Sequence, residues 1–174
     1  MEKLKLIGKG VFTKCYQKDE KTVILHSKCP LKECMSFGWF PDTPLFPKLE
    51  RIDYLDDGET QVYEMKYYPK VKSLKNNLKE SQWKIYKELV RIRRENINTP
   101  KNHHMLYNHW QKAFKTIKNR RVKDIMLQAL DACANYGSDI CFEISPRNVA
   151  VDKGKLVLLD VFFMYSKLQE VRSK

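Results

Sequence analysis

The fold is decided by residues 143–162, which read EISPRNVAVDKGKLVLLDVF. Pro146 and Asn148 are typical of a loop. Two short apolar runs follow, separated by the turn sequence Asp152-Lys153-Gly154, and such a pattern predicts a small β-hairpin. The stretch therefore predicts a loop, a hairpin and a carboxylate, Asp160, at the end of the hairpin.

Upstream, the N-terminal part predicts strands joined by tight turns. Extended patterns occupy residues 4–6, 11–16 and 22–26, and Gly8-Lys9-Gly10 separates the first two of them. Pro30 suits the first turn of a short helix that runs to about Gly38. Together these segments predict three strands followed by one helix.

Two more strands and then three helices are predicted further along the chain. Residues 49–55 and 61–68 flank the polar turn Asp56-Asp57-Gly58-Glu59, which indicates a hairpin. From Ser73 onward the apolar residues recur every three to four positions, as in amphipathic helices. The expected helices cover residues 73 to about 95, 106–117 and 122–136, with Gly137 as the C-terminal cap of the last.

The aromatic residues and histidines of this helical region are types that can bind nucleic-acid bases or metal ions, but their spacing does not favour either role. Trp83, Tyr86, Trp110 and Phe114 lie at helical spacing and are predicted to be core residues rather than stacking platforms for bases. His103, His104 and His109 do not share a helical face with a carboxylate or a cysteine, so a metal site is not expected.

The overall composition is that of a single globular domain. Of 174 residues, 43% are hydrophobic and 31% are charged, which supplies enough apolar material for a core. The sequence predicts neither a membrane helix nor a signal peptide, and therefore a cytoplasmic protein without a membrane partner. The five cysteines form no CxxC pair, so we expect reduced thiols.

The positive charge is concentrated in one third of the chain. The net charge is +12, and residues 66–124 contain 17 Lys or Arg and four acidic residues, a local balance of 17 − 4 = +13. Such an excess favours an acidic protein or a nucleic acid as partner. Lys112, Lys115 and Lys118 are spaced three apart and are the candidate partner-binding residues, with a solvated helix face as the alternative.

The order of these elements and motifs resembles that of the protein kinase fold. Residues 8–16 resemble a glycine-rich loop, residues 143–148 are similar to a catalytic loop, and residues 158–162 lie where the metal-binding Asp of the Asp-Phe-Gly motif belongs. The resemblance implies an α+β, minimal bilobal fold. Its N-lobe would be a five-stranded antiparallel sheet plus one helix in residues 1–68, and its truncated, mainly helical C-lobe would be residues 69–174.

The resemblance also implies a nucleotide site that uses ATP and Mg²⁺. Its glycines would let the backbone approach the phosphates, two side chains would line the nucleotide, and two would hold the metal. These roles fall to Gly8 and Gly10, to Cys15 and Met65, and to Asn148 and Asp160. Glu143 stands in the position of the catalytic base.

The chain departs from the kinase pattern at four positions. Leu25 occupies the place of the lysine that contacts the nucleotide phosphates, and Glu143 replaces the catalytic Asp with a side chain one methylene longer. Thr13 replaces the third glycine, and Ser145 stands where many protein kinases keep a lysine. Only 14 residues follow Asp160 in this sequence, so an activation segment and a peptide-docking platform are not expected.

Two other lysines are candidates to replace the missing one. Lys14 precedes Cys15 on the second strand, although strand alternation places it on the opposite face, and Lys28 follows the third strand. Glu33 is the candidate for the glutamate that pairs with the kinase lysine. Because Leu25 leaves it without that partner, Glu33 is expected to be a surface residue.

Three functions remain open at this point, and the weakest of them is direct nucleic-acid binding as the whole function, through Lys and Arg contacts to phosphate. In its compactness and in its GxGxF sequence, the chain looks most like the early host-takeover kinases of lytic bacteriophages, which would place it in the host cytoplasm. The departures favour a degenerate kinase-like protein, or pseudokinase, that binds an acidic host protein or a nucleic acid. The alternative is an active ATP- and Mg²⁺-dependent serine/threonine kinase that modifies host proteins.

Overall fold

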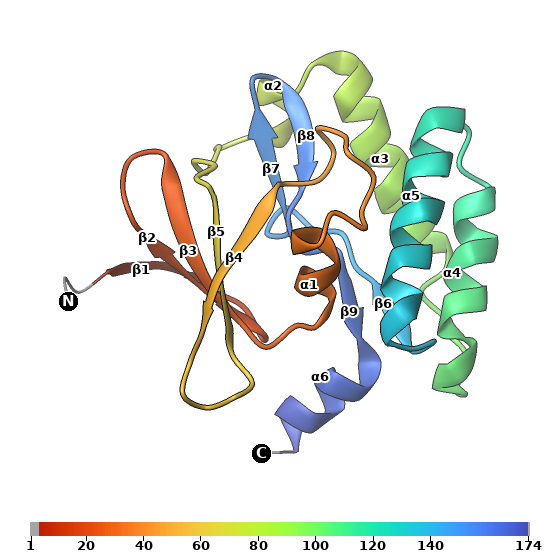
Figure 1. Ribbon diagram of the computed structural model, residues 1–174. Coiled ribbons are helices and arrows are strands. Elements are labelled where there is room, and N and C mark those ends of the chain that lie inside the picture. The colour runs from red at the N-terminus through yellow and green to blue at the C-terminus, as the bar shows by residue number, and fades with distance from the viewer. Residues whose placement is uncertain (1–3, 174) are drawn as a thin grey trace.

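The computed structural model describes residues 4–173, and their N-terminal part is a five-stranded antiparallel sheet (Figure 1). The strands follow the order β1-β2-β3-β5-β4, so β3 lies at the centre and only β5 departs from the chain order. This confirms the predicted sheet. The strand bounds are β1 Lys5–Lys9, β2 Thr13–Gln17, β3 Thr22–Ser27, β4 Leu49–Tyr54 and β5 Gln61–Lys66.

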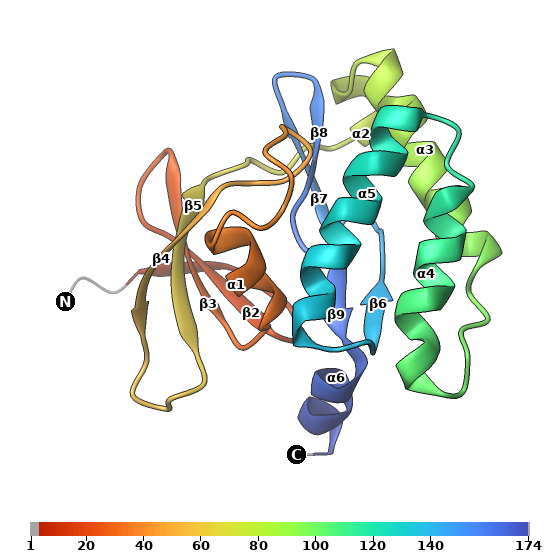
Figure 2. The ribbon, with the colours of Figure 1, turned by 45° about the vertical axis from the view of Figure 1, so that its right-hand side comes forward.

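One short helix, α1 (Leu31–Ser36), connects β3 to β4 and lies between the sheet and the rest of the protein (Figure 2). Pro30 precedes it and Gly38, with a φ of +71°, follows it, as the sequence predicted. It contacts β4 on one side and α5 and β9 on the other. Leu31, Lys32 and Cys34 are all buried because neighbours cover the helix on both sides.

The C-terminal part is mainly helical, with two small two-stranded sheets beside the helices (Figures 1 and 2). Strand β6 pairs with β9, and β7 pairs with β8, each pair antiparallel. The helices are α2 Leu74–Asn77, α3 Glu80–Glu95, α4 Leu106–Lys115, α5 Arg120–Cys133 and α6 Tyr165–Arg172, and the strands are β6 Ile140–Phe142, β7 Val149–Asp152, β8 Lys155–Leu158 and β9 Phe162–Met164. The predicted α+β arrangement, a five-stranded antiparallel sheet with one helix followed by a mainly helical region, is thereby confirmed.

The main core joins the helices to the β6–β9 pair. Phe114 of α4 meets Phe142 of β6 edge to face at 5.0 Å, and Phe142 lies 5.7 Å from Phe162 of β9. Trp110 is 1% exposed, and Tyr86 is buried as well. The aromatic side chains predicted to be core residues are therefore in or against the core.

The β7–β8 hairpin turns at Lys153 and Gly154, which both have positive φ, 49° and 79°. This is the backbone of a type I′ turn, which matches the right-handed twist of the two strands. The hairpin was predicted from these residues. Of the helices within residues 4–173, none is long and apolar enough to cross a membrane.

Candidate functional site

Asn148 and Asp160 are held together at the open end of the β7–β8 hairpin. The carbonyl oxygen of Asn148 accepts hydrogen bonds from the backbone N–H groups of Leu159, at 2.8 Å, and Asp160, at 3.4 Å. The loop before β7 closes on itself, since the N–H of Asn148 donates to the carbonyl of Ser145 at 3.0 Å and the two side chains also bond at 3.2 Å. The fold thus brings an amide and a carboxylate to one place.

The carboxylate of Asp160 binds a lysine that no sequence motif indicates. The ammonium Nζ of Lys32, in α1, lies 3.2 Å from Oδ1 of Asp160 and 3.4 Å from the carbonyl oxygen of Leu159. The Lys32 side chain is 5% exposed, whereas that of Asp160 is 39% exposed. The ion pair therefore joins a buried cation to a carboxylate that still meets solvent.

The position of the expected kinase lysine is apolar and part of the core. Leu25 is 5% exposed and packs with Val23, Leu49 and Tyr63 on one face of the sheet. A charged group at this position would lose that apolar packing. The absence of a β3 lysine is thus compensated within the sheet by hydrophobic contacts.

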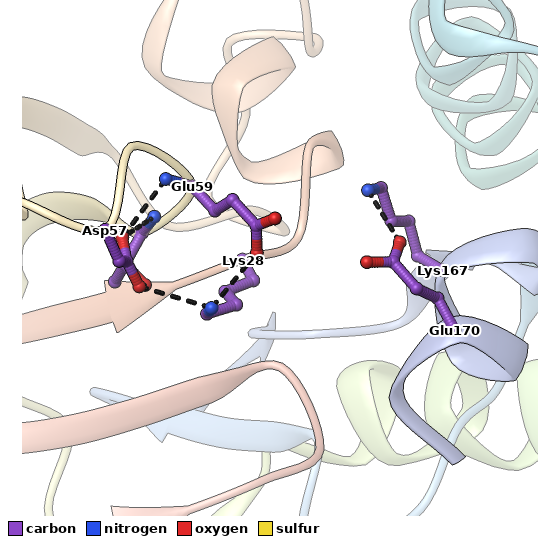
Figure 3. A network of polar contacts seen from close by, with 6 residues as sticks. Lys28, Asp57, Glu59, Lys167 and Glu170 are labelled. Atoms are coloured by element: carbon purple, nitrogen blue, oxygen red, sulfur yellow. Dashed lines mark hydrogen bonds and ion pairs between the residues drawn. The ribbon is translucent and has the colours of Figure 1, made fainter. Parts of the chain in front are cut away.

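Neither of the two proposed replacement lysines reaches Asp160. Lys28 bonds to Asp57 at 3.2 Å and to Glu59 at 3.1 Å, both in the loop between β4 and β5, and Figure 3 shows this cluster apart from the Lys167–Glu170 pair of α6. Lys14 is exposed on β2 opposite His26. The structure gives neither suggestion support, because the side chain of Lys28 is held by Asp57 and Glu59 and Lys14 is exposed on β2.

Glu33 is not the surface residue that was expected. Its carboxylate accepts a hydrogen bond from Arg51 of β4 at 2.6 Å and another from the hydroxyl of Tyr136, and its side chain is 17% exposed. Burial raises the pKa of the Tyr136 hydroxyl above its ordinary value, and the neighbouring carboxylate of Glu33 raises it further, because both disfavour the charged phenolate. Glu33 thus connects α1 to β4 and to the segment after α5.

The glycine turn between β1 and β2 bends toward the C-terminal part of the protein. The N–H of Gly10 donates to the carbonyl of Thr13 at 2.8 Å, and the ring of Phe12 lies 6.3 Å from that of Phe163 in β9. A Cβ added to Gly8 or Gly10 would meet nothing closer than 3.6 Å. Packing within the chain therefore does not require glycine at either position.

Cys15 and Met65 lie on the face of the sheet that also carries Leu25. Cys15 pairs with Leu25 in register, and Met65 pairs with Val23. Burial raises the pKa of the Cys15 thiol, while the positive charges of Lys32 and, to a smaller extent, Lys70 oppose this increase. Two cations are therefore close enough to Cys15 to act on its thiol.

Glu143, at the position of the catalytic base, is fixed only by its backbone. Its N–H donates to the carbonyl of Val161 at 2.9 Å, and the residue is exposed. Among residues 4–173 the carboxylate of Glu143 has no hydrogen-bond or ion-pair partner. Nor does the described part of the chain contain a cluster of three or more His, Cys, Asp or Glu side chains suited to a metal ion.

The candidate partner-binding lysines lie far from these groups in the fold. Lys112 and Lys115 are exposed on α4, and Lys118 is exposed just after it, where its N–H donates to Glu88 at 2.6 Å. In both ribbon views α4 lies on the side of the helical region away from the sheet (Figures 1 and 2). Their role in binding stays a prediction.

No family model and no curated protein matches this chain. Among solved structures, it is similar to a thermostable mutant of an aminoglycoside phosphotransferase, crystallised as a ternary complex with AMP-PNP and hygromycin B, with 13% sequence identity and a TM-score of 0.40. The match covers 94% of this chain and 68% of the phosphotransferase chain.

Proposed function

We propose that this chain is a degenerate kinase-like protein that binds Mg-ATP beside Asn148 and Asp160, and that works through binding rather than through rapid phosphoryl transfer. The observation that carries the proposal is the pair of hydrogen bonds by which the carbonyl of Asn148 holds the backbone of Leu159 and Asp160. These bonds fix the backbones of the two candidate metal ligands relative to each other. Fixed positions reduce the entropic cost of binding a cation.

The residues beside this pair fit a metal-bound polyphosphate. The amide oxygen of Asn148 and the carboxylate of Asp160 are hard oxygen ligands, and Mg²⁺ in proteins takes one or two such ligands and keeps several waters. Lys32 supplies a positive charge next to them. Gly8 and Gly10 leave the backbone open to a close approach. When bound, Mg²⁺ would neutralise part of the charge of the phosphates.

The proposal favours binding over turnover because of Glu143. Its carboxylate is exposed, and no described side chain orients it. Compared with Asp, the extra methylene displaces the carboxylate by about 1 Å, and a displacement of that size costs a factor of order 10² in rate. Nucleotide binding does not depend on this carboxylate.

The direct test is a thermal unfolding experiment with the full chain. At a concentration about 100 times its dissociation constant, Mg-ATP should increase the free energy of unfolding by roughly 2.7 kcal/mol. ATP with EDTA is the matched control and should give a smaller shift, since the metal supplies part of the binding. An unfolding midpoint that is the same with and without Mg-ATP would rule out the proposed function.

A second candidate function is capture of an acidic partner, protein or nucleic acid, by the exposed lysines on and after α4. The observation that favours it is that Lys112, Lys115 and Lys118 are all exposed within a segment of net charge +13. The resemblance to phage kinases would make this partner a host molecule.

Replacing Lys112, Lys115 and Lys118 together by Glu should abolish such capture without unfolding the protein. The three side chains are exposed, and surface changes cost little stability. For duplex nucleic acid, the affinity of the wild type should fall with salt at a log–log slope of about −0.9 per phosphate contacted. The experiment is a binding titration at several salt concentrations, and unchanged affinity and slope in the triple variant would assign these lysines to a solvated face.

A further inference from the structure

Lys32 is unusual among the charged residues of this protein. Within residues 4–173 it is the single charged residue that is buried, at 4% exposed. A buried ammonium is stable only with an anionic or strongly accepting partner, because it has lost its hydration. The burial of Lys32 therefore indicates that this site accommodates an anion next to its ammonium group.

The partners of Lys32 within the chain do not satisfy it completely. An ammonium has three donors, and Lys32 uses two of them, one on Oδ1 of Asp160 at 3.2 Å and one, at a long 3.4 Å, on the carbonyl of Leu159. The adjacent Glu33 cannot help, since Arg51 and Tyr136 occupy its carboxylate. In the described part of the chain, one donor of Lys32 is left for another acceptor.

The surroundings of Lys32 favour a polyphosphate as that acceptor. Its charge and that of Lys70 both act on the Cys15 thiol, and Cβ of Cys15 lies 3.6 Å from the position that a Cβ of Gly8 would take. Lys32, Cys15 and the glycine turn are thus parts of one region. Lys32 and Lys70 bring two positive charges to this region, and Lys32 lies next to the carboxylate of Asp160, which would hold a divalent cation.

We infer that Lys32, from helix α1, is the phosphate-contacting cation of this site, in place of the lysine that β3 lacks at Leu25. Without nucleotide, Lys32 is held by Asp160, and the two charges neutralise each other. When Mg-ATP binds, the ammonium of Lys32 would contact phosphate oxygens instead of Asp160. The carboxylate of Asp160 would then contact Mg²⁺ instead of Lys32. The inference rests on the proposed Mg-ATP binding, and it identifies Lys32 as the residue that makes the nucleotide site specific for phosphates.

The test compares ATP with adenosine, both in MgCl₂, in two lysine variants. Lys32→Met should weaken the binding of ATP by about 10- to 100-fold, the usual value of one charge-assisted hydrogen bond, and should leave the binding of adenosine unchanged. Lys28→Met is the matched control because it removes a lysine whose side chain pairs with Asp57 and Glu59. This control should bind both ligands as the wild type does.

Each outcome separates the inference from the proposed function. If the wild type does not bind Mg-ATP, the proposed function fails and the inference fails with it. If the wild type binds and Lys32→Met binds ATP equally well, only the inference is overturned. Equal losses for ATP and adenosine would also overturn it, because they would show that Lys32 merely supports the fold.

A measurement on the wild-type protein keeps the test decisive even where Lys32→Met does not fold. An acyl phosphate of ATP transfers its acyl group to the lysine amine that lies against the phosphates and releases ATP. Peptide mapping by mass spectrometry should find the label on Lys32. Label on Lys14, Lys28 or Lys70 with none on Lys32 would overturn the inference.

Discussion

Replacing Asp160 by Asn is expected to destabilise the protein and to abolish Mg-dependent ATP binding. The amide keeps the shape of the carboxylate but leaves the buried ammonium of Lys32 without a charged partner. Breaking such a pair costs about 2–4 kcal/mol, and the estimate lies below that for a fully buried pair because Asp160 is 39% exposed. Urea unfolding measures the first effect, and calorimetric titration with Mg-ATP measures the second.

The matched control is Glu59→Gln. Glu59 also forms an ion pair with a lysine, but both partners in that pair, Glu59 and Lys28, are about half exposed. Solvent replaces an exposed partner easily, so this substitution should leave the unfolding transition nearly unchanged. Equal stability of Asp160→Asn and the wild type would contradict the view that Lys32 depends on Asp160.

Replacing Glu143 by Asp should produce the largest gain in activity. The backbone at this position is held by the bond from its N–H to the carbonyl of Val161, so the shorter side chain withdraws the carboxylate by about the length of one methylene. We expect transfer or hydrolysis of the ATP γ-phosphate to increase by a factor of order 10². Release of labelled phosphate and labelling of the protein itself, both with radiolabelled ATP, measure the effect.

Glu143→Gln serves as the comparison for that gain. It keeps the length of the glutamate but cannot accept a proton, so its phosphate transfer should not exceed that of the wild type. Both variants should bind Mg-ATP as the wild type does, since Glu143 has no part in the proposed binding site. If Glu143→Asp binds Mg-ATP and is no faster than the wild type, the length of this side chain is not what limits turnover.

The β7–β8 hairpin could be predicted from the sequence because the residues of its own turn and strands determine its structure. The turn at Lys153 and Gly154 places both residues at positive φ, and the apolar runs on either side form the hairpin that ends before Asp160. The prediction failed for β6 and β9, which were not expected as strands. Each has three residues, too few for a periodic pattern, and the 19 residues 143–161 separate the two strands in the chain.

The role of α1 could not be obtained from its own residues. A helix of six residues is too short to show which face is buried, and here both sides are covered, so even Lys32 is buried. The partners of Glu33 are 18 and 103 residues away in the sequence. Only the tertiary structure brings Asp160, Arg51 and Tyr136 to α1, and these contacts decide which of its charged residues reaches the site.

The double attachment of α1 also limits how the two parts of the protein can move. Rotating the sheet away from the helical region, as in hinge opening, would separate Lys32 from Asp160 and the Cys34 thiol from the carbonyl of Ala132. Moving α1 away with the helical region would instead break the bond between Glu33 and Arg51. Helix α1 therefore holds the two parts of the protein in a fixed relative position. Its amide hydrogens should exchange with deuterium only when the whole structure unfolds.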